Sequence, residues 1–241
     1  QTCALPILLM AGTGLGFALL DRFWPLMLVA LVGTLNPSNG DVSVFLPLEH
    51  SVLARFVGDR NRTPAFARYS LLGAVFGAVG SLAATLWPAK VMFLLYAAIA
   101  VVVALLYSGL PRTTEQAPAR AALGPSKNRV YTLAALFSLD AFGGGFVVQS
   151  LLTLWLHQRF NTSIATAGVI FFWVGLFNAV SYLVAVRIAG RFGLVNTMVF
   201  THIPSSLCLL ALPFVPGLPY AVALLFVRGL LSQMDVPTRT S

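Results

Sequence analysis

The sequence predicts an all-α polytopic membrane protein, a bundle of transmembrane helices, from three observations. The chain has 241 residues, of which 58% are apolar and 9% are charged, whereas a soluble domain carries about 25% charged residues. The mean hydropathy of +0.87 indicates lipid as the solvent. The apolar residues form long runs without the alternation of apolar and polar positions that marks a transmembrane β-strand. These features exclude an ordinary soluble enzyme, a nucleic-acid-binding domain and a disordered chain.

Eight apolar runs are each about long enough to cross a hydrocarbon core of about 30 Å as a helix. A helix is the expected form because it satisfies every backbone polar group within the segment. In chain order the runs are Ala4–Leu20, Pro25–Pro47, Phe66–Trp87, Val91–Leu110, Val130–Leu156, Ile164–Ile188, Leu194–Val215 and Pro219–Met234.

Short polar connections separate the first four runs. Residues 21–22 follow the first run, residues 58–64 the second and residues 87–90 the third. Within the second run, Pro37 and Gly40 loosen the expected helix. Asp41 follows directly after this loosened stretch of the second run.

The last four runs follow the longest connection, residues 111–129, which is rich in Ala, Pro, Thr and Arg and is typical of a flexible linker. The fifth run contains Gly143–Gly145, and three successive glycines predict either a bend or the close approach of another helix. The remaining connections are residues 157–163, 187–193 and 215–219.

Basic residues gather at the connections on one side of the expected membrane. Connections after odd-numbered runs carry three, Arg22, Lys90 and Arg159. Connections after even-numbered runs, with the chain end, carry eleven: Arg55, Arg60, Arg62, Arg68, Arg112, Arg120, Lys127, Arg129, Arg187, Arg191 and Arg239. The positive-inside rule places the second set in the cytoplasm. The net charge of +8 is thus mainly an orientation signal, and we expect no nucleic-acid partner.

Three ionisable residues lie deep within the runs, where such groups are costly and are functional candidates by default. They are Asp41, Asp140 and Arg228. Asp140 and Arg228 have the alternative interpretation of a structural ion pair between packed helices. Asp41 has the alternative of hydrogen bonding to freed backbone groups. Asp235, near the cytoplasmic surface, fits an interfacial cap or a salt-bridge partner.

Motifs for metal binding or catalysis are missing from the sequence. None of His50, His157 and His202 has a second metal ligand three or four residues away. There is no His-Glu-x-x-His, no Gly-x-Ser-x-Gly and no Walker loop. We therefore expect neither a metal, a cofactor nor an enzymatic activity.

With this arrangement the chain resembles the major facilitator superfamily, in which two six-helix halves are joined by a long cytoplasmic loop. Residues 111–129 look like that loop, so the runs correspond to family helices three to six and seven to ten. The resemblance implies an internal fragment: residues 8–110 as the remnant of one half and residues 130–241 as part of the other, related by pseudo-symmetry. Residues 1–7 resemble a translated sequencing adapter and are expected to be an artefact.

Three local stretches carry the resemblance further. Residues 189–193 are similar to the family's Asp-Arg-x-Gly loop, although Gly190 replaces the Asp. Gly33 and Gly40 suit the family's helix-four motif, but Val29 stands where that motif has Arg. The stretch from residue 49 to residue 62 is similar to the family's four-to-five loop. The implied cytoplasmic gating residues are Arg191, Gly193, Glu49, Arg62, Asp235 and Arg239.

In that family helices one, four, seven and ten line the central cavity, and the three deep charges fall on helices four, seven and ten. The resemblance implies a secondary transporter that moves a small organic solute across the bacterial cytoplasmic membrane by alternating access. We expect proton-coupled efflux by a monomer, with Asp140 and Arg228 as a switching pair. Protonation of Asp140 would free Arg228 for an anionic group or for another partner.

Further polar candidates for substrate contact are Asn36, Asn39, Gln149 and Asn178. Uptake of a small solute is the nearest alternative to efflux. An intramembrane enzyme is a rival interpretation, for which Glu49-His50 is the only suitable pair. A non-transporting membrane scaffold is the other.

Overall fold

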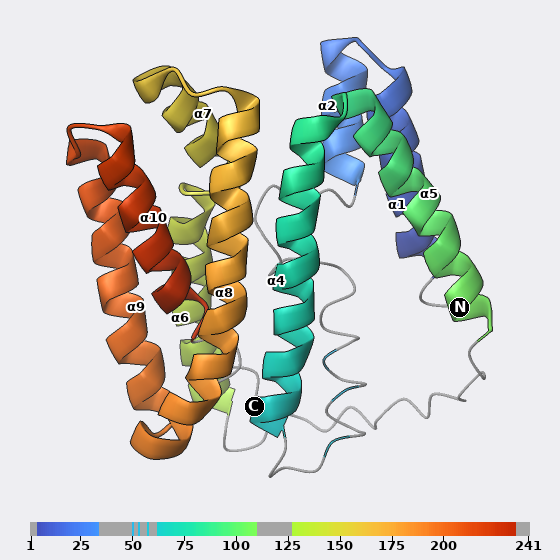
Figure 1. Cartoon of the computed structure of the whole chain (residues 1–241). Helices are drawn as coiled ribbons and strands as arrows, with labels where there is room; N and C mark the ends of the chain where they lie inside the picture. Colours follow the sequence, from blue (N-terminus) through green and yellow to red (C-terminus); the bar gives the residue numbers. More distant parts are fainter. Residues whose placement is uncertain are drawn as a thin grey trace.

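The computed structural model describes residues 4–33, 50, 53, 57, 62–109 and 127–234. All regular secondary structure in these ranges is helical, which confirms the predicted all-α bundle (Figure 1). The helices are α1 (Ala4–Leu19), α2 (Phe23–Val32), α4 (Arg62–Leu86), α5 (Ala89–Ser108), α6 (Lys127–Gly145), α7 (Gln149–Phe160), α8 (Ile164–Phe192), α9 (Leu194–Ala211), the 3-10 turn η2 (Leu212–Phe214) and α10 (Leu218–Ser232). Helix α1 begins inside residues 1–7, and the assignment of those residues to an artefact stays a prediction.

Four helices of the described ranges are long and apolar enough to span a membrane: Arg62–Leu86, Ala89–Leu106, Ile164–Phe192 and Leu194–Phe214. The segments Ile7–Leu19, Phe23–Val32 and Leu218–Ser232 are apolar but shorter. The connections alternate between the two ends of the bundle, as the run order predicts. Those from α1 to α2, α4 to α5, α7 to α8 and α9 to α10 lie at the top of Figure 1, and the α8–α9 turn lies at the bottom.

The fifth run is two helices, not the single continuous helix that its length predicted. Helix α6 ends at Gly145 and α7 begins at Gln149. Two backbone hydrogen bonds cap carbonyl groups at the end of α6. The amide of Phe146 donates to the carbonyl of Gly143 at 3.2 Å, and the amide of Val147 donates to the carbonyl of Gly144 at 3.1 Å. A side chain added at any of the three glycines would meet nothing within 4 Å. The glycines therefore mark a break and not a close helix approach.

Helix α1 packs against α5 and α2 through glycines. A Cβ atom at Gly14 would lie 2.7 Å from the carbonyl oxygen of Phe93 on α5. The Phe93 ring stacks on Phe17, with centroids 5.0 Å apart. On the other side, a Cβ at Gly16 would lie 2.9 Å from the side chain of Val29. Val29 thus serves as a packing residue between α1 and α2.

Helices α4 and α8 lie side by side along much of their length, although the linker separates them in the sequence (Figure 1). Gly175 of α8 faces α4, and a Cβ there would lie 2.8 Å from the Cβ of Ala78. Two turns earlier Gly168 lies against the side chain of Thr85. Small residues at this spacing let two backbones approach closely, which is the usual basis of helix packing in lipid.

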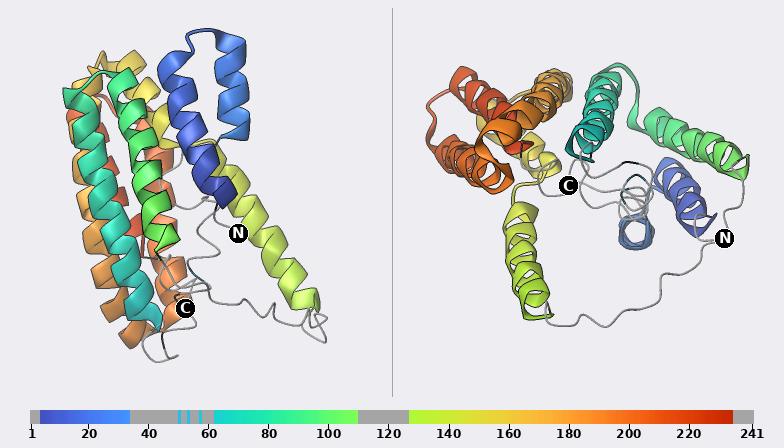
Figure 2. Two further views of the ribbon diagram at one scale, coloured as in Figure 1. Left: turned by 90° about the vertical axis from the view of Figure 1, so that its right-hand side faces the viewer. Right: turned by 90° about the horizontal axis from the view of Figure 1, so that it is seen from below.

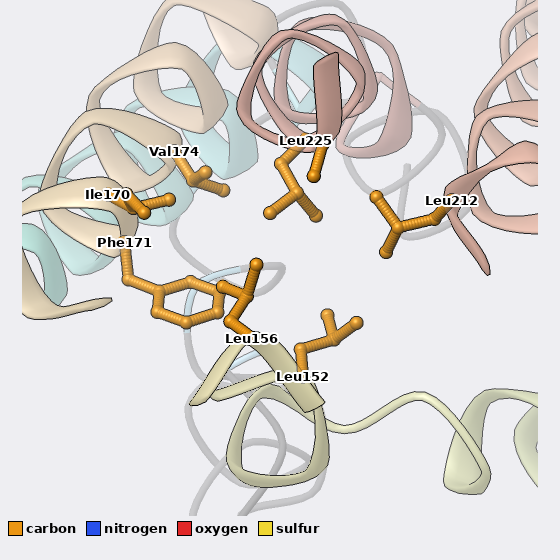
Figure 3. Packing of buried hydrophobic residues seen from close by; sticks show 8 residues of the cluster. Leu152, Leu156, Ile170, Phe171, Val174, Leu212 and Leu225 are labelled. Atoms are coloured by element: carbon orange, nitrogen blue, oxygen red, sulfur yellow. The ribbon is translucent and has the colours of Figure 1, made fainter. Parts of the chain in front are cut away.

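Helices α7, α8 and α10 and the turn η2 contribute the main hydrophobic cluster (Figure 3). Leu152 and Leu156 of α7 point toward Phe171 of α8 and Leu225 of α10. Leu156 and Leu225 are 0% and 2% exposed. This cluster fixes α7 and α10 against α8 above the polar residues described next.

Candidate functional site

Helices α8 and α10 start at the same end of the bundle and run in parallel (Figure 1). Gly229 allows their close approach, because a Cβ there would lie 3.2 Å from the carbonyl oxygen of Val174 and 3.4 Å from Oδ1 of Asn178. One turn further, the Tyr182 hydroxyl donates a hydrogen bond of 2.8 Å to Oε1 of Gln233. The contact of Asn178 with Gly229 and that of Tyr182 with Gln233 each join residues 51 apart in sequence, so they define one parallel register.

Arg228 precedes Gly229 on α10 and is half-buried in the group formed by α8, α9 and α10. Its Nε atom is buried and has no hydrogen-bond partner among the described residues. A partly buried guanidinium is costly to desolvate, and residues 149–234 contain no carboxylate to neutralise it, which marks Arg228 as the chemically unusual residue of the described bundle.

Three uncharged polar atoms near this register also lack partners within the described ranges. They are Oδ1 of Asn178 and the Oγ atoms of Ser181 and Ser232. Asn178 is 8% exposed and Ser181 is fully buried. The register of 51 places Ser181 level with Ser232, immediately before the Tyr182–Gln233 bond. Buried polar atoms are nearly always hydrogen-bonded in native proteins. Three such atoms without a partner, close together between α8 and α10, therefore indicate a binding site for a polar group.

Sequence reasoning singled out Asn178 and Arg228 as candidates and did not single out Ser181 and Ser232. The missed signal was the spacing within each run. Ser181 follows Asn178 by three residues and Ser232 follows Arg228 by four, so each pair shares a helix face. The other member of the polar level, Tyr182 with its hydrogen bond to Gln233, was also not anticipated.

Asp140 lies on α6, and its side chain is outside the described part of the structure. Helix α6 packs along none of the described helices and leans away from α8, α9 and α10 (Figure 2). Its described side chains are exposed. The expected pairing of Asp140 with Arg228 therefore stays a prediction. Gln149 is the first residue of α7, directly after the break in the fifth run, and is half-buried.

The expected gating residues that the structure describes lie at helix ends. Arg62 is the first residue of α4. The Arg191 guanidinium lies over the ring of Phe192 in the last turn of α8, 5.6 Å from its centroid. Gly193 joins α8 directly to α9 and has φ +85°. Its amide donates to the carbonyl of Ala189 at 2.9 Å, which closes α8 before the chain reverses.

Six of the expected site residues lie outside the described residues: Asn36, Asn39, Asp41, Glu49, Asp235 and Arg239. Within the described ranges no group of three or more His, Cys, Asp or Glu side chains is placed to hold a metal ion.

Comparison with known proteins gives a family and one similar sequence. The family model of the Major Facilitator Superfamily matches residues 4–238. The chain is 27% identical over 287 aligned residues to the uncharacterized membrane protein YJR124C of Saccharomyces cerevisiae, an alignment that covers 98% of the chain. The chain spans 63% of the length of that yeast protein. No solved structure matches the chain.

Proposed function

Because this chain belongs to the major facilitator superfamily, we propose that it acts as a secondary active transporter of a small organic solute. Transport in this proposal uses alternating access, in which packed helices rock about a site near the membrane midplane. The observation that carries the proposal is the half-buried Arg228, whose Nε lacks a partner among the described residues of a highly apolar bundle. Placing a cation in such a bundle is costly, so a cation that is found there is a functional candidate by default.

Proton coupling through Asp140 is the second part of the proposal. A carboxylate near the midplane binds a proton readily, because burial disfavours its charged form. When Asp140 is ionised it holds Arg228, and when it is protonated Arg228 is free for another partner. Binding and release of a proton at Asp140 would thereby be linked to the side of the membrane to which the site at Arg228 is open.

The test is flux into proteoliposomes that contain the full chain, measured with and without an imposed pH gradient. Asp140→Asn is expected to abolish the response of flux to the gradient, since asparagine binds no proton. Asp21→Asn is the matched control, because Asp21 pairs with Lys90 at 2.9 Å in an exposed connection. An Asp140→Asn variant with unchanged gradient-driven flux would contradict the coupling.

Direction and location complete the proposal. We propose efflux, because the predicted cavity helices are apolar and aromatic with few fixed charges. We also propose that the protein works as a monomer in a bacterial cytoplasmic membrane, although the similar protein is from yeast. Everted vesicles energised with a proton gradient should then accumulate the substrate, and accumulation in right-side-out vesicles would instead indicate uptake.

A further inference from the structure

We propose that Arg228, Asn178, Ser181 and Ser232 form a binding site for the oxyanion group of the transported solute, so that the substrate is a small organic anion. This inference rests on the proposed transport function and names its substrate class. It assigns binding roles to Ser181 and Ser232, whose hydroxyls have no partner in the described structure.

The charge balance of the surrounding helices is the first argument. Residues 149–234, which include α7 to α10, contain four arginines and no Asp or Glu. No carboxylate from this region can therefore neutralise Arg228. Its counter-charge has to come from another part of the chain or from a bound anion. An arginine fork binds carboxylate and phosphate groups through two parallel hydrogen bonds.

The hydrogen-bonding capacity at the same level is the second argument. The hydroxyls of Ser181 and Ser232 each supply a donor, and these two residues are level in the parallel register of α8 and α10. Oδ1 of Asn178 supplies an acceptor. Arg228 and the two serines can donate hydrogen bonds to the oxygens of an anion. Oδ1 of Asn178 can accept a hydrogen bond from a hydroxyl or amino group of the same solute.

The break in the fifth run adds positive potential at this depth. The N-cap of α7, Val148, makes no side-chain capping bond, so the first amides of α7 lack helical partners. Leu152, one turn inside α7, and Leu225, one turn before Arg228, belong to the same buried cluster (Figure 3). Because α7 and α10 are antiparallel (Figure 1), the start of α7 and Arg228 lie on the same side of that cluster.

Access to the site follows from its packing. Arg228 and Ser232 are half-buried, whereas Asn178 and Ser181 are buried, so an incoming anion reaches the first two residues before the last two. Oδ1 of Asn178 faces the tight contact between α8 and α10, where Gly229 presents no side chain, and Ser181 follows Asn178 by about one turn of α8. A small shift of α10 along α8 therefore exposes them, and a bound anion bridges the two helices.

The experiment is thermal unfolding of the detergent-solubilised full chain in the sodium salts of lactate, malate, glutamate and phosphate, with chloride at equal ionic strength as the reference. At least one of the four anions is expected to raise the melting temperature in a saturable manner. Arg228→Gln should abolish the shift, and the double variant Ser181→Ala/Ser232→Ala should weaken apparent affinity at least tenfold. Arg187→Gln, which removes an exposed arginine of α8, should leave it unchanged.

Each outcome decides the proposal. A shift with the carboxylates assigns organic acids, and a shift with phosphate alone assigns phosphate esters. The absence of a saturable shift with all four anions, or its persistence in Arg228→Gln, overturns the site. If Arg228→Gln does not fold, Arg228→Lys and the double serine variant carry the test, and full anion binding in both overturns it. If anions bind but no solute crosses the membrane of the proteoliposomes, the transport function is refuted and the anion site stands. If a neutral solute is transported and Arg228→Gln leaves its flux unchanged, the anion site is refuted and the transport function stands.

Discussion

Gly193 holds a backbone conformation that other residues adopt only under strain, with φ +85° and ψ 160°. This region of φ and ψ is accessible essentially to glycine alone, at a cost of about 1–3 kcal/mol for other residues. Gly193→Ala is therefore expected to lower the free energy of unfolding by about that amount, seen as a lower melting temperature in detergent.

The control for this prediction lies three residues earlier. Gly190 is inside α8, is exposed, and has nothing within 4 Å of an added Cβ. Gly190→Ala should therefore be neutral or stabilise the helix by up to about 1 kcal/mol. Equal effects of the two substitutions would contradict the conformational explanation.

We expect His50 to make the stability of its contact with α4 depend on pH. Its ring contacts Phe66 and Tyr69 edge-on, with centroids 5.0 and 5.7 Å away, and desolvation by burial lowers its pKa below the ordinary 6.5. The unfolded chain then binds a proton before the folded chain does, so stability falls as pH drops below about 6.5. Melting temperatures at pH 7.5 and 5.5 should differ, and His50→Gln should reduce this difference.

At the scale of single residues, the sequence predicted those whose chemistry conflicts with their surroundings. Arg228 was identifiable because an arginine is rare in an apolar run, and Asn178 because it is polar. Ser181 and Ser232 were not, since serine is common in transmembrane helices and only the pairing of α8 with α10 puts these two at one level. The packing of α8 against α10 is tertiary structure, which the sequence of either apolar run alone does not predict.

Between elements, the contact of α4 with α8 depends on small residues. Gly175→Leu would place a side chain where even a Cβ lies 2.8 Å from Ala78. Overpacking of this kind costs roughly 1–3 kcal/mol, so the variant should melt at a lower temperature. Gly80→Leu is the matched control on α4, because that glycine is exposed and has nothing within 4 Å of an added Cβ. A similar loss in both variants would show that bulk alone, and not this contact, is responsible.

The lengths of most elements followed from hydropathy, but their interruptions did not. The fifth run is mainly apolar, so composition predicted one helix, with Gly143–Gly145 as either a bend or a contact. The two alternatives differ only in whether another helix approaches the glycines, and that depends on neighbours distant in sequence. The structure leaves these glycines open and breaks the helix after them.

For the whole molecule, the alternation of the connections leads to the last prediction. The α1–α2, α4–α5 and α7–α8 turns lie at one end of the bundle and the α8–α9 turn lies at the other (Figure 1). Since the basic residues gather at the second end, the first should face away from the cytoplasm. Single cysteines placed in a background with Cys3→Ser and Cys208→Ser can test this in intact cells with a membrane-impermeant maleimide.

We expect Pro88→Cys to be labelled in intact cells and Gly190→Cys to be labelled only after the membrane is permeabilised. Both positions are exposed, so accessibility within the bundle does not limit the reaction and the membrane barrier alone separates the two results. The reverse pattern would invert the protein and place the basic ends outside. Labelling of both positions from one side would mean that the chain crosses the membrane an even number of times between them, whereas the three intervening runs predict an odd number. That result would alter the assignment of the runs to family helices three to ten.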